Sequence, residues 1–127
     1  LKKGHINYDT DTGKVQVKDG ELSYCVALKD YDFINCDIRG ELVNCDIFGG
    51  TMEGSDIQYC NFYNGVKIKS TKLKNCYISY DSVAEDCYIY GRGILKGKMI
   101  KGIFREGKYD KKRARFDGTE KIQYVEV

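Results

Sequence analysis

Large apolar residues recur about every five positions between Tyr31 and Tyr109, and a small residue usually stands two places before each of them. A spacing near five fits neither the 3.6-residue period of an amphipathic helix nor the two-residue period of a long strand. It is typical of a repeat in which very short strands alternate with corners. The large residues are Phe33, Ile38, Val43, Ile47, Met52, Ile57, Phe62, Ile68, Leu73, Ile78, Val83, Ile89, Leu95, Met99, Phe104 and Tyr109.

The small residues are mainly Cys, Gly, Ser and Thr, and the positions between units carry Asn or Gly. In a short strand, residues i−2 and i point to the same side, so the small and the large residue share the interior. Asn and Gly tolerate the positive φ that a sharp corner needs. The interior pattern and the corner residues therefore predict the same β-solenoid.

Four such walls make a coil of about twenty residues, in which each large residue lies about 4.8 Å from the one roughly twenty positions later. The predicted columns place Ile57 on Ile38 and Phe62 on Val43. The sequence thus predicts an all-β fold, a quadrilateral parallel β-helix of about four coils over residues 31–116.

Several units resemble the pentapeptide-repeat family, whose motif is a small residue, a polar one, a central Leu or Phe, and two further polar ones. The resemblance covers roughly residues 31–110 and implies a right-handed quadrilateral β-helix from a mostly non-enzymatic family. The sequence departs from the motif in its preference for Ile, its uneven steps and its Gly-rich last coil, and Glu41 and Asp81 do not suit inward small positions. The best units are Cys36-Asp37-Ile38, Cys45-Asp46-Ile47, Ser55-Asp56-Ile57, Cys60-Asn61-Phe62 and Thr71-Lys72-Leu73.

The segments that flank the repeat are predicted to cap it within one domain, residues 1–127. Residues 1–30 contain two alternating stretches around a Gly-containing loop, which predicts a β-hairpin. Residues 117–127 end in an alternating strand that we expect to close the other end. Residues 91–116 keep the five-residue spacing, although their Gly-x-Phe/Tyr cadence also fits antiparallel hairpin repeats of the membrane-occupation type.

Five of the six cysteines occupy the small interior position, where Cys behaves as a buried apolar residue. The predicted columns separate cysteines of one wall by two coils, roughly 9–10 Å, whereas a disulfide needs Cα atoms within about 7 Å. No Cys-x-x-Cys pair indicates zinc. We therefore expect reduced thiols, in the cytoplasm or inside a virion, and not a secreted protein.

No catalytic, cofactor-binding or metal-binding constellation is visible, so we predict a protein that is not an enzyme. His5 is the only histidine, and a five-residue repeat offers no cleft. The alternating carboxylates from Asp9 to Gly13 lack the later ligands of a calcium loop, which favours a hairpin turn. No apolar run is long enough to span a membrane. The chain begins at Leu1 and not at Met, as expected of a processed product or a piece of a longer chain.

Charge is segregated along the chain. Residues 92–115 hold ten Lys or Arg and two carboxylates, a net charge of +8, which leaves −6 for the rest because the whole chain carries +2. Clustered cations attract phosphates through counterion release, complementary charged ends orient end-to-end contacts, and solvated faces also segregate without any function. The ten cations are Arg92, Lys96, Lys98, Lys101, Arg105, Lys108, Lys111, Lys112, Arg113 and Arg115.

Six tyrosines at outward positions form a second candidate binding set. Tyrosine is enriched in binding patches because it contributes contact area with few rotamers. Cross-strand ladders that only shield the sheet explain the same positions equally well. The six are Tyr59, Tyr63, Tyr77, Tyr80, Tyr88 and Tyr90.

These features favour an interaction or assembly module that binds protein partners or a second copy of itself. A viral or phage structural component is suggested by analogy alone. The alternative is nucleic-acid contact through the basic residues 92–115. Some pentapeptide-repeat proteins mimic DNA with an acidic surface, and the basic last coil argues against that activity here.

Overall fold

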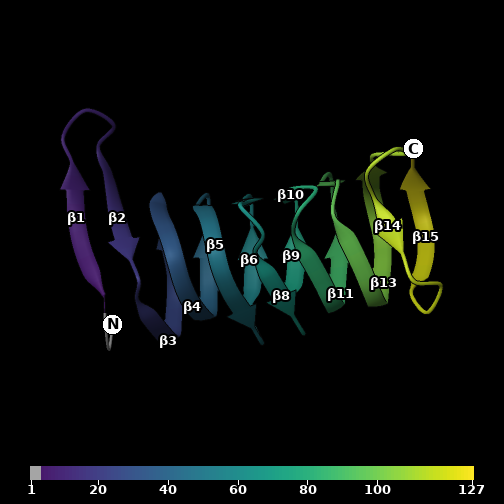
Figure 1. The fold of residues 1–127 in the computed structure, drawn as a ribbon, viewed down its shortest axis with the longest axis horizontal. Coiled ribbons are helices and arrows are strands. Elements are labelled where there is room, and N and C mark those ends of the chain that lie inside the picture. Colours follow the sequence, from purple (N-terminus) through teal and green to yellow (C-terminus); the bar gives the residue numbers. More distant parts are fainter. Residues whose placement is uncertain (1–3) are drawn as a thin grey trace.

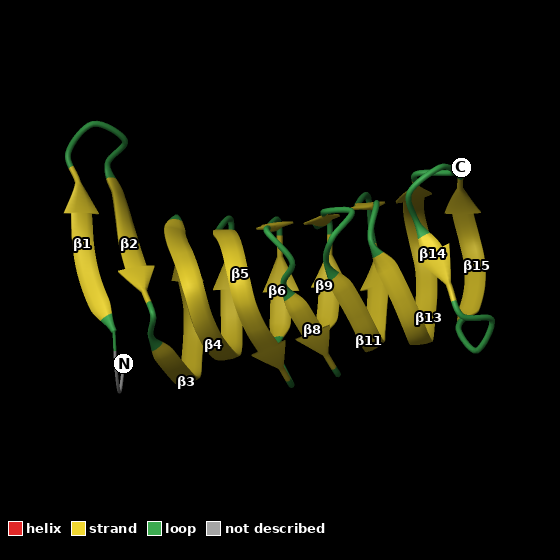
Figure 2. Ribbon diagram, viewed as in Figure 1, coloured by secondary structure: helices red, strands yellow, loops and turns green. Residues whose placement is uncertain are grey.

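The computed structural model describes residues 4–127, apart from the side chain of residue 27. These residues form strands stacked along one long axis, with the β1–β2 hairpin at one end and β15 at the other (Figures 1 and 2). No helix that could cross a membrane occurs among the described residues. The strands are β1 (His5–Asp9), β2 (Lys14–Lys18), β3 (Glu21–Lys29), β4 (Tyr31–Val43), β5 (Asp46–Glu53), β6 (Asp56–Gln58), β7 (Asn61–Tyr63), β8 (Lys67–Lys69), β9 (Lys72–Lys74), β10 (Tyr77–Ile78), β11 (Val83–Tyr90), β12 (Ile94–Leu95), β13 (Lys98–Tyr109), β14 (Arg115–Phe116) and β15 (Lys121–Glu126).

The stack is a parallel β-solenoid of about seven turns, more than the four coils predicted, with a repeat spacing of about 16 residues instead of twenty. For example, Asp46 pairs with Asn61, which in turn pairs with Tyr77. The predicted all-β solenoid is confirmed. β11 and β12 also pair in parallel with β13, so residues 91–116 continue the solenoid and do not form antiparallel hairpins.

Each turn has three walls, not the four predicted. Between walls the chain turns at residues with positive φ, such as Asn35 and Asn44, and three such corners close the turn. The predicted columns are therefore wrong: Ile38 pairs with Met52 of the next turn and not with Ile57. The inward columns are Phe33, Ile47, Phe62, Ile78 and Leu95 on wall A, Ile38, Met52, Ile68, Ala84 and Met99 on wall B, and Leu42, Ile57, Leu73, Ile89 and Phe104 on wall C.

Two predicted inward residues lie one position away from the true ones. Leu42 and Ala84 are fully buried, whereas the predicted Val43 and Val83 are half-buried on the outer side. A shift of one residue along a strand moves a side chain to the opposite face. Two places before Leu42 and Ala84, the chain has a Gly and a Ser, which are small enough for the interior. The acidic residues that the predicted register placed there lie outside it.

The small interior positions lie close to the backbone of the preceding turn. At Gly102, a Cβ atom would lie 2.3 Å from the carbonyl oxygen of Cys87, and the φ of +88° also disfavours any larger residue. The same approach occurs at Gly50, where a Cβ atom would lie 2.2 Å from the Cys36 carbonyl oxygen. Glycine is therefore needed at both positions, in the early turn that holds Gly50 as in the late turn that holds Gly102.

All six cysteines are free thiols. Each of the five buried ones donates a hydrogen bond from its thiol to the carbonyl oxygen two residues earlier, at 3.3 to 3.4 Å. Cys45, Cys60 and Cys76 occupy consecutive turns of wall A, so the predicted two-coil separation is wrong for them. Burial raises the pKa of Cys76 and of Cys87 to about 12, and both thiols stay protonated near neutral pH.

The two ends of the described chain have the predicted elements. β1 and β2 pair in antiparallel register, and the carboxylate of Asp9 accepts the backbone N–H of Asp11 in the loop between them, which confirms the hairpin. β15 pairs in parallel with β13 as the last strand of the stack. The first three residues of the predicted N-terminal cap lie outside the described residues.

Candidate polyanion-binding surface

The solenoid distributes the ten predicted cations over all three walls of its last turns. Lys108 lies on wall A, Lys98 and Arg115 on wall B, and Arg105 on wall C. Nine of the ten are exposed, and Lys96 is half-buried. In the part of the chain that the structure describes, none of the ten forms an ion pair with a carboxylate. Their charge is therefore available to a ligand.

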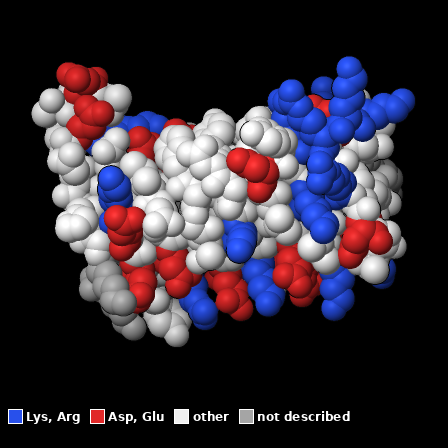
Figure 3. Space-filling model, in the orientation of Figure 1, with Lys and Arg blue, Asp and Glu red and all other residues white. Residues whose placement is uncertain are grey.

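Six of the ten cations gather where wall A meets wall B, and we call them the basic corner. Lys98 and Arg115 are register partners on adjacent strands, β13 and β14. The loop that leads into β14 adds three consecutive cations. Figure 3 shows Lys and Arg concentrated at this end of the molecule. The basic corner comprises Lys96, Lys98, Lys111, Lys112, Arg113 and Arg115.

The loop of the basic corner is a structured turn. The Asp110 carboxylate accepts the backbone N–H groups of Lys112 at 2.9 Å and of Arg113 at 3.1 Å, and the Asp110 carbonyl oxygen accepts that of Ala114. Asp favours this position because its side chain bonds to the backbone two residues ahead. The N–H of Lys112 in particular lowers the pKa of Asp110, which stays ionised. The turn thus fixes where the three cations project.

Two tyrosines adjoin the basic corner. The Arg113 guanidinium lies 6.0 Å from the centre of the Tyr80 ring, and the Lys96 ammonium lies 5.2 Å from that of Tyr77. Tyr77 continues along wall A into a ladder, with ring centres 5.6 Å apart between Tyr77 and Tyr63 and 5.3 Å between Tyr63 and Phe48. The ladder packs partly against its own sheet, because Tyr63 and Tyr77 are half-buried.

The six predicted tyrosines do not form one patch. Tyr88 and Tyr90 lie on wall C, with ring centres 5.1 Å apart. Tyr59 is exposed at a corner with a φ of 55°. The predicted set therefore spans two walls and two corners.

The opposite end of the molecule is richer in carboxylates. Figure 3 shows an acidic projection at the end opposite the basic corner and on the same side of the molecule, with a hollow of mostly uncharged residues between them. Lys14 bonds Asp46 at 3.1 Å and Asp32 at 3.4 Å, so part of this negative charge is paired. On this side of the molecule the two ends therefore differ in charge, whereas Lys and Asp or Glu are mixed along the opposite side in the same view.

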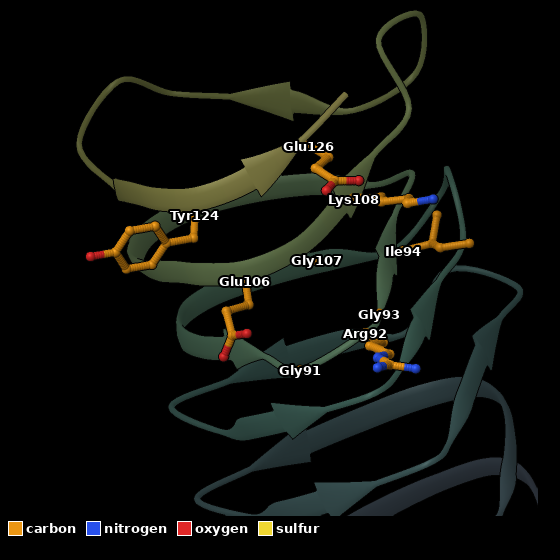
Figure 4. A pocket seen from close by; sticks show the side chains of 9 residues that line it. All are labelled: Gly91, Arg92, Gly93, Ile94, Glu106, Gly107, Lys108, Tyr124 and Glu126. Carbon is orange, nitrogen blue, oxygen red and sulfur yellow. The ribbon is translucent and has the colours of Figure 1, made fainter.

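A groove of about 480 Å³ lies between the last turns, at a corner where three glycines leave the backbone bare. Two cations and two carboxylates line it, so its charges balance (Figure 4). The Glu126 carboxylate lies beside Lys108, its register partner on the adjacent strand, whereas the other two charged side chains point away from this pair. The exposed ring of Tyr124 stands apart from all four. This geometry offers neither a phosphate site nor a converging acid–base pair. The groove is lined by Gly91, Arg92, Gly93, Ile94, Glu106, Gly107, Lys108, Tyr124 and Glu126.

Other chemistry-bearing residues are dispersed. His5 is exposed on β1. Within residues 4–127, no group of three or more His, Cys, Asp or Glu is placed to hold a metal ion. The cationic surface is therefore the candidate functional site of this molecule.

No family model matches the chain, and no curated protein or solved structure matches it significantly.

Three further cations were missed by sequence reasoning. Lys72 and Lys74 on β9 and Lys121 on β15 lie on wall C with Tyr88 and Arg105, although they fall outside residues 92–115. Each of the three lies a whole number of turns from Tyr88 or Arg105, and the wrong repeat length concealed this alignment.

Proposed function

We propose that this protein is a non-enzymatic β-solenoid that binds nucleic acid at its basic corner. The observation that supports this is the gathering of six cations, five of them exposed, without a carboxylate partner in the described part of the chain. Such clusters bind phosphate backbones because each contact releases condensed counterions.

The shape of the basic corner favours contact with phosphates. Its cations stand on a convex edge between two walls and on the turn that Asp110 fixes. A convex edge reaches the phosphate backbone, whereas reading a sequence requires an element that enters a groove. We therefore expect binding that depends strongly on salt and little on base sequence.

The test compares two double variants that remove equal charge. Lys111→Gln/Lys112→Gln alters the exposed turn of the basic corner, and Lys67→Gln/Lys69→Gln alters exposed positions of β8 on wall B. Binding of a labelled 20-base-pair duplex is followed by fluorescence anisotropy between 50 and 200 mM salt. The corner variant is expected to lower the slope of log K against log salt by up to about 1.8, since each phosphate contact contributes about 0.9.

The control variant is expected to retain the slope. No binding at 50 mM salt, or equal binding by both variants, would contradict the proposal. Far-UV circular dichroism of both variants verifies that the solenoid is intact.

Self-association is a second candidate, because the terminal strands have free edges. Within the described residues β1 pairs only with β2, and β15 only with β13. Both edge strands expose apolar side chains, with Ile6 64% and Tyr124 78% exposed. An uncovered strand edge pairs readily with another chain. A second copy, stacked end to end, is the partner that this arrangement supports.

Sedimentation velocity tests that candidate. We expect the mass to rise with concentration, and we expect Ile6→Lys/Tyr8→Lys on the β1 edge to abolish the rise. A chain that remains monomeric at millimolar concentration would rule self-association out.

The setting of this function is also a proposal. Six unpaired thiols support a reducing compartment such as the cytoplasm or a virion interior. Membership of the pentapeptide-repeat family rests on the motif units alone, and the three-wall turn departs from the four walls that the resemblance implies.

A further inference from the structure

Wall C presents cations and tyrosines on four successive strands. Residues 72–74 of β9, 88–90 of β11, 103–105 of β13 and 121–123 of β15 are aligned in parallel register. Their middle residues point inward and the residues on either side point outward. None of the eight outward residues is acidic. These are Lys72, Lys74, Tyr88, Tyr90, Ile103, Arg105, Lys121 and Gln123.

The tyrosines and cations of this strip contact one another. The rings of Tyr88 and Tyr90 are 5.1 Å apart and tilted by 55°. Arg105 donates a hydrogen bond from Nη1 to the Tyr88 hydroxyl at 3.1 Å, and the Lys74 ammonium lies 6.0 Å from the centre of the Tyr90 ring. A cation therefore stands beside the aromatic pair on the strand before it and on the strand after it.

Acidic residues bound the strip. On the preceding turns the same column holds Asp56, which pairs with Lys72, and Glu41, which pairs with Asp56. Asp86 and Glu106 flank the strip at its two corners. Phosphates are repelled from these positions, so the favourable area spans four strands, or about 14 Å along the axis.

We infer that this strip of wall C binds a short stretch of single-stranded nucleic acid, whose bases stack on Tyr88 and Tyr90. Phosphates contact the lysines and the arginine on the flanking strands. Unpaired bases can splay onto aromatic side chains of an open sheet, whereas the bases of a duplex are already stacked inside it. The site goes beyond the proposed function, because it lies on another wall and selects single strands.

The first test removes the rings. Tyr88→Leu/Tyr90→Leu keeps apolar side chains on wall C, and Phe48→Leu/Tyr63→Leu removes a stacked aromatic pair from wall A, away from the basic corner, as a matched control. The probes are a fluorescein-labelled 12-nucleotide thymidine single strand and a hairpin duplex of equal length. We expect the wall C variant to weaken single-strand binding about a hundredfold, on the order of tenfold for each ring. The wall A variant is expected to change it less than about threefold.

The second test removes the lysines. β8 and β9 are matched strands of sequence KIK and KLK, each with two outward lysines around a buried residue. Lys72→Gln/Lys74→Gln is expected to lower the salt slope for the single strand by about 1.4, since each contact with a single strand contributes about 0.7. Lys67→Gln/Lys69→Gln is expected to leave that slope unchanged.

The outcomes separate this inference from the proposed function. Loss of single-strand binding in the wall C variants supports the inference whatever the basic-corner variant does. Unchanged single-strand affinity in the wall C variants overturns it, even if the basic-corner variant still loses duplex binding. Equal loss for the single strand and the hairpin in the tyrosine variant, or equally tight binding of a poly-glutamate peptide, also overturns it, because stacking on unpaired bases is then not the source of affinity.

Discussion

The register predicted from the sequence places Val43 in the interior, whereas the three-wall register of the structure places Leu42 there. Replacing Leu42 by Ala therefore tests the three-wall register. Leu42 is 0% exposed in the core of wall C, with Leu28 and Ile57 as its register partners on the neighbouring strands. Truncation of a buried leucine forfeits its transfer free energy and leaves a cavity, which costs about 3–5 kcal/mol. Strand pairing on both sides limits how far the walls can collapse into the cavity. With an m-value of about 2 kcal/mol/M, the urea midpoint falls by roughly 1.5–2.5 M.

Val43→Thr is the matched control. Val43 is half-buried on the outer side of the same strand. Threonine keeps its β-branched shape and places a hydroxyl toward water, so the change in unfolding free energy is within about 0.5 kcal/mol. Urea unfolding is followed by circular dichroism and by tyrosine fluorescence, since a repeat array unfolds in one step only if both probes agree. A Val43→Thr loss as large as that of Leu42→Ala would refute the register.

Two further perturbations follow from the same interior. Gly102 and Gly118 have nearly equal φ values of +88° and +89°, but only at Gly102 would an added Cβ atom meet the backbone of another strand. In urea unfolding, Gly102→Ala is therefore expected to lower the free energy of unfolding by about 1–3 kcal/mol more than Gly118→Ala does. Equal costs would show that the close approach to Cys87 is absent. Burial raises the pKa of Cys76 from 9.0 to about 12, so the folded chain keeps a proton that the unfolded chain releases. The stabilisation is complete below pH 9 and is lost as the pH rises toward 12. Cys76→Ala should therefore flatten the decline of the urea midpoint between pH 9 and 11, and an unchanged decline would exclude this thiol as its source.

The solenoid class was predictable from the sequence, but the number of walls was not. A small residue two places before a large one, with Asn or Gly between units, specifies a short strand and a corner for any number of walls. The number of walls depends on how sharply each corner turns, and the sequence at Asn35 or Asn44 does not state that angle. The register errors at Val43 and Val83 followed from keeping a five-residue step after Ile38 and Ile78. The unit Gly40-x-Leu42 offered the correct choice, because its small residue precedes an apolar one.

The candidate surface was predictable only in part, for a related reason. The dense basic run ending at Arg115 is visible in the sequence, yet the chain winds around the axis and spreads its charges over three walls. Residues that meet on one wall are about 16 positions apart. Lys72, Tyr88 and Lys121 become neighbours in one column only when that spacing is known.

The constant step between turns makes the molecule extendable in whole units. Asp56 and Lys72 occupy equivalent places on successive turns, so joining residue 55 directly to residue 72 keeps the order of the walls and the triangular cross-section. Such a deletion, or the matching duplication, changes the length by one strand spacing, about 4.8 Å, and leaves the girth untouched. Gain or loss of gene segments that each encode one turn can therefore change the distance between the two ends of the molecule in equal steps.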